Sequence, residues 1–170
     1  AAYGRVQAEM DAALPKLDRG LGSDVFWSLG MKTSARNALR GTVADISPGA
    51  VSAEVTLALG EGVAITAILT RQSIEDLGLA VGLPAIALIK ASFVVLAKGE
   101  GLRTSARNQI AGRVTSREDG AVNSEIALDI GGGKTLVATV TLESARSLQV
   151  EVGDAVTALI KAPHVILAVE

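Results

Sequence analysis

Short runs of alternating apolar and polar residues dominate the chain from about residue 38 onward. The clearest run, 50–59, places an apolar residue at every second position: Val51, Ala53, Val55, Leu57 and Leu59. A period of two predicts a β-strand that buries one of its faces. Similar runs at 38–46, 63–69, 85–89 and 93–97 predict four further short strands.

Two turns and one short helix separate these predicted strands. Ser47-Pro48-Gly49 and Gly60-Glu61-Gly62 have the composition of turns. Residues 70–77 predict a short helix with Thr70 as its N-cap. The expected order is therefore β-β-β-α-β-β. Five short strands with a helix between the third and fourth indicate a small OB-like barrel.

The same pattern occurs twice without a gap. Thr33-Ser34-Ala35-Arg36-Asn37 returns as Thr104-Ser105-Ala106-Arg107-Asn108, and Leu88-Ile89-Lys90-Ala91 returns as Leu159-Ile160-Lys161-Ala162, both at an offset of 71 positions. A gapless repeat of this length predicts one structural unit built twice, each copy a small domain in its own right. We expect copy one at 32–98 and copy two at 99–170.

The segment before the repeats has a different pattern. Residues 1–20 have a helical stripe of apolar residues, formed by Val6, Met10, Ala13, Leu14 and Leu17. Pro15 is expected to kink or end that helix. Residues 1–31 are thus expected to hold the end of a linker or dimerisation helix and a connector. The fold class is all-β, with two tandem five-stranded barrels preceded by a helical segment.

Composition excludes several kinds of site. The chain has no cysteine, and His164 is its only histidine, so thiolate chemistry and histidine-rich cation sites are excluded. No apolar run is long enough to span a bilayer, and we expect a cytoplasmic protein without membrane contact. The net charge of −2 and the scarcity of aromatics, none of which recurs, argue against a nucleic-acid surface on the barrels.

The residues that do recur are hydroxyls and cations. They stand in the opening motif, at the start of the predicted helix and after the fourth strand: Ser34, Arg36, Thr70, Ser73 and Lys90, then Ser105, Arg107, Thr141, Ser144 and Lys161. Hydrogen-bond donors and cations without acceptor carboxylates are typical of an oxyanion receptor rather than a metal-cation site. The pattern predicts a small-anion binder with no catalytic residues and no cofactor.

Each of these residues also has a purely structural interpretation. Thr70 and Thr141 could be helix caps, and Lys90 and Lys161 could guard edge strands against aggregation. Ser34 and Ser105 could form turns. Arg36 and Arg107 could pair on the surface with Glu54 and Glu125, which we otherwise interpret as part of a solvated strand face.

Glu54 and Glu125 provide one recurring carboxylate per copy, which is too few for an acid–base pair. We therefore expect no enzyme.

These motifs resemble the molybdate-binding Mop domain. The likeness rests on Thr-Ser-Ala-Arg-Asn, then Thr-x-x-Ser before a short helix, then Leu-Ile-Lys-Ala, and it covers about residues 32–170. The tandem arrangement is similar to the di-Mop region of ModE-type molybdate-responsive regulators and of molbindins. The resemblance implies OB-like barrels, often with strand exchange, and molybdate or tungstate bound at subunit or repeat interfaces. It assigns the binding roles to the ten residues named above.

Two functions and one structural alternative follow. We favour the ligand-sensing region of a molybdate-dependent transcription regulator, a homo-oligomer with a dimer favoured, which contacts DNA only through an N-terminal domain absent from this chain. The alternative is a molbindin-type intracellular molybdate store or buffer. A purely structural oligomeric barrel without a ligand is the third reading, and saturable oxyanion binding would reject it.

Overall fold

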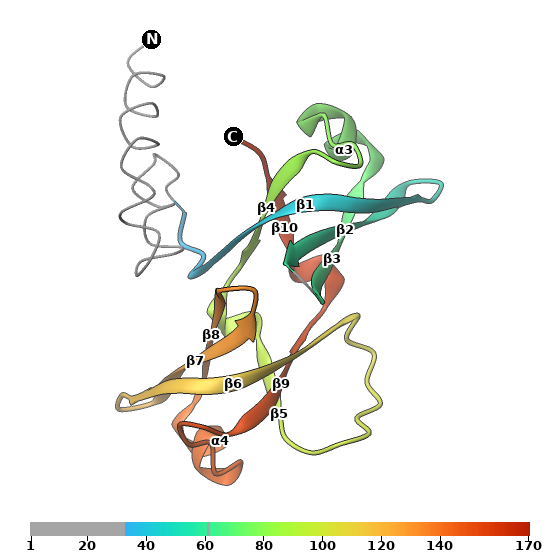
Figure 1. Ribbon diagram of the computed structural model, residues 1–170. Coiled ribbons are helices and arrows are strands. Elements are labelled where there is room, and N and C mark those ends of the chain that lie inside the picture. The colour runs from blue at the N-terminus through green and yellow to red at the C-terminus, as the bar shows by residue number, and fades with distance from the viewer. Residues whose placement is uncertain (1–32, 61) are drawn as a thin grey trace, which may run out of the picture. The chain divides into compact units, whose positions relative to one another are not determined.

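The computed structural model describes residues 33–60 and 62–170 (Figure 1). The helix expected over residues 1–20 and the connector to residue 31 lie outside this described part. Within it, no helix is long and apolar enough to cross a membrane.

Both copies have the expected order of elements. Copy one comprises β1 (Asn37–Pro48), β2 (Ser52–Gly60), β3 (Val63–Thr70), α3 (Arg71–Leu77), β4 (Pro84–Ile89), the 3-10 turn η1 (Ala91–Phe93) and β5 (Val95–Ala97). Copy two repeats it with β6 (Asn108–Asp119), β7 (Asn123–Gly131), β8 (Lys134–Thr141), α4 (Leu142–Ser147), β9 (Ala155–Ile160), η2 (Ala162–His164) and β10 (Ile166–Ala168). The β-β-β-α-β-β prediction is confirmed twice.

The boundaries differ from the expectation at three places. The first strand continues through Pro48, because its pairing with β2 extends to Ala53 beyond an irregularity at Val43/Asp45. The fifth strand begins only at Val95, because Ala91–Phe93 form a 3-10 turn. The alternation predicts that Val51 lies in the second strand, but β2 begins at Ser52, and Val51 is 74% exposed in the turn before it.

Each sheet is completed by the last strand of the other copy. β10 pairs antiparallel with β4, matching Ile166 with Leu88, and β5 pairs with β9, matching Val95 with Leu159. The two sheets therefore have the orders β10-β4-β1-β2-β3 and β5-β9-β6-β7-β8 (Figure 1). The expectation of two domains that are each complete in their own right is corrected: a copy alone leaves its fourth strand unpaired on one side.

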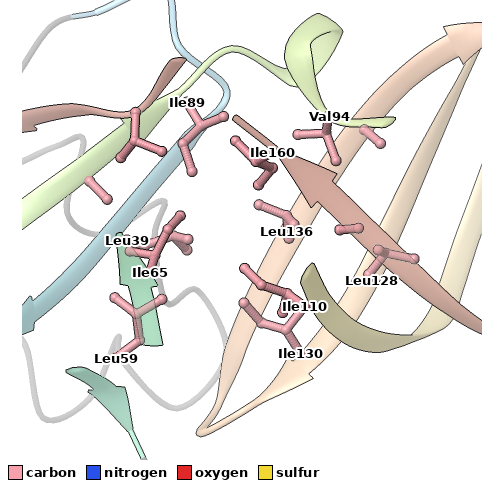
Figure 2. Packing of buried hydrophobic residues seen from close by; sticks show 14 of the residues in the cluster. Leu39, Leu59, Ile65, Ile89, Val94, Ile110, Leu128, Ile130, Leu136 and Ile160 are labelled. Carbon is pink, nitrogen blue, oxygen red and sulfur yellow. The ribbon is translucent and has the colours of Figure 1, made fainter. Parts of the chain in front are cut away.

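The buried faces of both sheets contribute to one hydrophobic cluster. Leu39 and Ile65 from copy one and Leu136 and Ile160 from copy two are among its members (Figure 2). Most of its side chains are aliphatic, as the scarcity of aromatics requires. Because strand exchange and a shared core both join the copies, burial in one copy depends on the other.

The helix ends show where duplication left a strained residue. Gly78 ends α3 with φ 64°, and at the equivalent position Gln149 has φ 53°. Glycine adopts this left-handed region without a penalty, whereas a side chain with a Cβ does not. Gln149 also accepts a hydrogen bond from Lys98 Nζ through its backbone oxygen at 2.8 Å, which a glycine would retain.

We expect Gln149→Gly to raise the free energy of unfolding by up to about 1 kcal/mol, because it removes the left-handed strain. The matched change Gly78→Ala should lower it by about 1 kcal/mol, since it introduces the same strain without meeting any neighbouring atom. Urea unfolding of both variants checks the pair. Changes of the same sign would contradict the interpretation.

Candidate functional site

Two buried asparagines tie the copies together at the start of β1 and of β6. The Asn108 side chain donates from Nδ2 to the backbone oxygen of Thr66 at 2.8 Å and accepts from the Thr66 N–H at 2.7 Å. Asn37 makes the same two bonds to Val137, also at 2.8 and 2.7 Å. β3 and β8 are edge strands of their sheets, so these backbone groups lack a strand partner. Each asparagine therefore substitutes for a missing strand.

The arginines next to these asparagines reach the other copy. Arg36 Nη2 lies 2.5 Å from Glu125 Oε1, and Arg107 Nε lies 3.4 Å from Glu54 Oε1. The expected surface pairing with a glutamate exists, but each arginine pairs with the glutamate of the other copy. Glu54 and Glu125, interpreted from the sequence as part of a solvated strand face, are thus the partners of the two candidate arginines.

Each candidate lysine lies at the same end of its sheet as the arginine of its copy. Asn37 pairs with Ile89, and Arg36 and Lys90 are the residues directly beyond this pair. Lys90 is exposed and places its Nζ 5.5 Å from the centroid of the Phe93 ring. In copy two, Asn108 pairs with Ile160, so Arg107 and Lys161 have the equivalent relation.

At the axis of the repeat, the rings of Phe93 and His164 are stacked. Their centroids lie 4.5 Å apart at an interplanar angle of 27°. These residues occupy equivalent positions of the two copies, three places after Lys90 and Lys161. The only histidine of the chain therefore packs on a ring between the two cation pairs.

Thr70 and Thr141 are the N-caps of α3 and α4, as one structural interpretation expected. Thr70 Oγ1 accepts from the Ser73 N–H at 3.1 Å and donates to Ser73 Oγ at 2.9 Å. Thr141 and Ser144 make the same pair of bonds at 3.0 and 2.7 Å. Because the threonine proton is used within the cap, the serine hydroxyl hydrogen remains available to donate outward. Capping and ligand donation are therefore compatible.

The register of β8 relates the cations of copy one to the hydroxyls of copy two. Val137 bonds to Asn37, Thr139 pairs with the glutamate that holds Arg36, and Thr141 lies two residues further. Two residues of a strand span about 6.7 Å. Thr141 therefore lies about 6.7 Å along β8 from the residue opposite the glutamate partner of Arg36, and within the described residues no hydrogen bond joins Arg36 to Thr141.

β3 shows the same relation in the opposite direction. Thr66 bonds to Asn108, Ile68 pairs with the glutamate that holds Arg107, and Thr70 follows two residues later. The structure thus places the arginine of each copy against the strand pair whose second strand ends at the hydroxyls of the other copy.

The opening serines are exposed. Ser34 and Ser105 both lie on the surface. The turn at the start of copy two is made instead by Thr104, whose Oγ1 accepts from the Ala106 N–H at 2.8 Å. A ligand role for Ser34 and Ser105 stays a prediction.

Other charged groups are already paired elsewhere. Hydrogen bonds from Arg117 and Ser124 hold the pKa of Asp119 below its usual value, and one from Lys98 does the same for the pKa of Asp154. None of these residues belongs to the candidate set. Within the described part of the chain, no group of three or more His, Cys, Asp or Glu side chains could hold a metal ion.

Sequence reasoning missed the role of the asparagines and the crossing of the arginine–glutamate pairs between the copies. Asn37 and Asn108 end the repeated motif, and burial of an amide at 2% and 5% exposure is the feature that distinguishes them. A buried amide must find partners. Its recurrence at the start of a predicted strand was the available signal.

The comparisons with known proteins agree along nearly the whole chain. The TOBE domain model matches residues 33–96 and again 104–167. The molybdenum-pterin-binding protein MopA of Rhodobacter capsulatus is 46% identical over 99% of this chain and 66% of its own length. The molybdenum transport protein ModE of Azotobacter vinelandii is 36% identical over 99% of this chain and 66% of its length. The chain therefore spans about two thirds of each of these relatives.

A solved structure matches both copies together. The cytoplasmic molybdate-binding protein ModG, crystallised with molybdate bound, is 42% identical and aligns with a TM-score of 0.78. The alignment covers 82% of this chain and 100% of the ModG chain. The tandem fold as a whole, rather than one copy, is thus shared.

We expect Asn108→Ala to lower the free energy of unfolding by about 1–3 kcal/mol, because it removes two hydrogen bonds and leaves the Thr66 backbone groups without their partner. Urea unfolding measures the change. Gln109→Ala is the control, since this exposed neighbour makes one long bond of 3.4 Å. Equal effects of the two substitutions would show that the asparagine does not hold the copies together.

Proposed function

The chain belongs to the TOBE domain family, and from that premise we propose that it binds molybdate or tungstate. One arrangement supports this most directly: the arginine of each copy pairs with a glutamate of the other copy, on the strand next to the one that ends at that copy's threonine–serine pair. A tetrahedral oxyanion offers acceptors on all sides and needs donors from several directions. The molybdate-bound ModG structure supports the choice of anion.

The proposed ligand residues are the ten that recur. The cations are Arg36, Lys90, Arg107 and Lys161, and the opening serines are Ser34 and Ser105. The other hydroxyl donors are Thr70, Ser73, Thr141 and Ser144. The helices that carry the hydroxyls have seven and six residues, so we assign the binding to side chains rather than to a helix dipole. The proposed sites lie at repeat or subunit interfaces, and the oxyanion is the ligand of a protein that needs no cofactor.

We further propose that the anion is sensed rather than processed. In this proposal the chain is the ligand-sensing region of a molybdate-dependent regulator, a cytoplasmic homo-oligomer, with residues 1–31 as the end of a dimer-forming segment and Mop domains at 32–98 and 99–170. Anion binding across an interface would stiffen the dimer and reposition DNA-binding domains that this sequence does not contain. Likeness to ModE supports this reading.

Molybdate storage is the second candidate function. The full-length alignment with ModG, whose whole chain corresponds to the two copies, supports it. The two functions differ in assembly: a dimer favours the sensor, and a larger ring favours the store.

Isothermal titration with molybdate in sulfate-containing buffer, run beside light scattering for mass, tests the proposal. Saturable heat that sulfate does not suppress is the expected result. Absence of heat together with an unchanged melting temperature would contradict oxyanion binding, because a ligand that binds only the folded state raises that temperature.

We expect Lys90→Ala and Lys161→Ala each to weaken molybdate binding about three- to tenfold without changing the melting temperature, because each removes one exposed cation from a proposed site. Titration of each variant measures the change. Lys134→Ala at the start of β8 is the control for loss of one positive charge. If both variants bind molybdate as tightly as Lys134→Ala does, the lysines are not ligands, and their role is to protect edge strands against aggregation.

A further inference from the structure

Glu54 and Glu125 are the only carboxylates that occupy equivalent positions in both copies. Each is held by the arginine of the other copy, so each contact occurs twice in the chain. The four side chains are 42–59% exposed, which lets water or a dissolved anion reach the guanidinium. A carboxylate thus already contacts the guanidinium N–H groups that a bound oxyanion would need.

We propose that Glu54 and Glu125 are built-in competitors of the oxyanion, which the ligand must displace from Arg107 and Arg36. This inference rests on the proposed function. A guanidinium presents its donors in a rigid fork that fits a carboxylate or a tetrahedral oxyanion, so the glutamate and a bound anion compete for the N–H group that the glutamate contacts. The pair is exposed, so the expected effect on affinity is modest, about two- to fivefold.

The two competitors have different neighbours. Glu125 lies directly opposite Glu118 on β6, whereas Glu54 lies directly opposite Ser47 on β1. Directly opposed residues of an antiparallel pair have Cβ atoms about 4.5–5.5 Å apart. A second carboxylate therefore lies beside the partner of Arg36, and a dianion that binds Arg36 approaches both charges. The nearest counterpart in copy one, Asp45, opposes Thr56 and lies one diagonal step from Glu54.

The residues beside the hydroxyls differ in the same sense. After Thr141 the first helical turn carries Leu142 and Glu143, and Glu143 is its acidic residue. After Thr70 the equivalent positions are Arg71 and Gln72, and this first turn has no acidic residue. The carboxylates of α3, Glu75 and Asp76, lie in the second half of that helix.

The two proposed sites are therefore unequal. On the Arg107 side, Glu54 lies opposite the neutral Ser47, and the first turn of α3 carries a positive charge. On the Arg36 side, Glu125 lies opposite a second carboxylate, and the first turn of α4 is acidic. The Arg107 side fills first, and the Arg36 side fills at higher anion concentration.

Titration of the full chain with molybdate at constant pH and ionic strength tests the competitor role. Glu125→Gln and Glu54→Gln should each tighten binding about two- to fivefold. The control is Asp129→Asn, which removes one negative charge from the same face of β7 about 13 Å away and keeps an acceptor for the Gly131 N–H. Tightening that matches the control would overturn the proposal, since only general charge would then matter.

Single-site chains test the inequality. Arg36→Ala leaves the Arg107 side and Arg107→Ala leaves the Arg36 side, so the first chain should bind molybdate more tightly than the second. Glu118→Ser should tighten the Arg107→Ala chain and leave the Arg36→Ala chain unchanged. Equal affinities of the two chains, or an equal response to Glu118→Ser, would overturn the assigned order.

Wild-type protein separates failure of this inference from failure of the proposed function. If wild type gives no saturable molybdate binding, the proposed function is wrong and the competitor role falls with it. If wild type binds but the glutamine variants do not differ from Asp129→Asn, only the competitor role is wrong. Melting temperatures of all variants identify any that fail to fold.

Discussion

The structure depends on a reciprocal exchange of backbone partners between its two copies. Each copy lends its last strand to the sheet of the other and inserts one buried asparagine side chain beside the other's open edge strand. Unpaired edge groups are costly or prone to aggregation, so each exchange removes a liability that a single copy would retain. The unpaired edge groups are satisfied only when both copies are present. The fold and the placement of the arginines therefore depend on the same exchange between the copies.

This constraint explains how a duplicated sequence can build a site from two sources. Asn37 and Asn108 fix the chain immediately after Arg36 and Arg107, and the register then sets which glutamate each arginine meets. In the proposed site, cations come from one copy and hydroxyls from the other. An oxyanion bound there would contact both copies, so its binding free energy would add to the cohesion of the pair.

The residue patterns predicted the elements, whereas strand exchange between the copies was implied only by the family resemblance. Alternation in β2 and the Thr-x-x-Ser cap of α3 report local structure, so strands and helices could be located within a few residues. The pairing of β5 with β9 is not local. Val95 pairs with Leu159, although its own copy offers the equivalent Leu88, because duplication gives both strands the same apolar pattern. The same symmetry hid the crossed ion pairs, since Arg36 could equally meet Glu54 or Glu125 by sequence alone.

The most direct measurement is a crystal structure of the chain grown with tungstate, whose anomalous scattering locates the ion without prior assumption. We predict an ion within hydrogen-bond distance of the Arg107 and Arg36 guanidiniums, with Glu54 and Glu125 moved away from them. An ion bound elsewhere while both arginine–glutamate pairs remain intact would contradict the account.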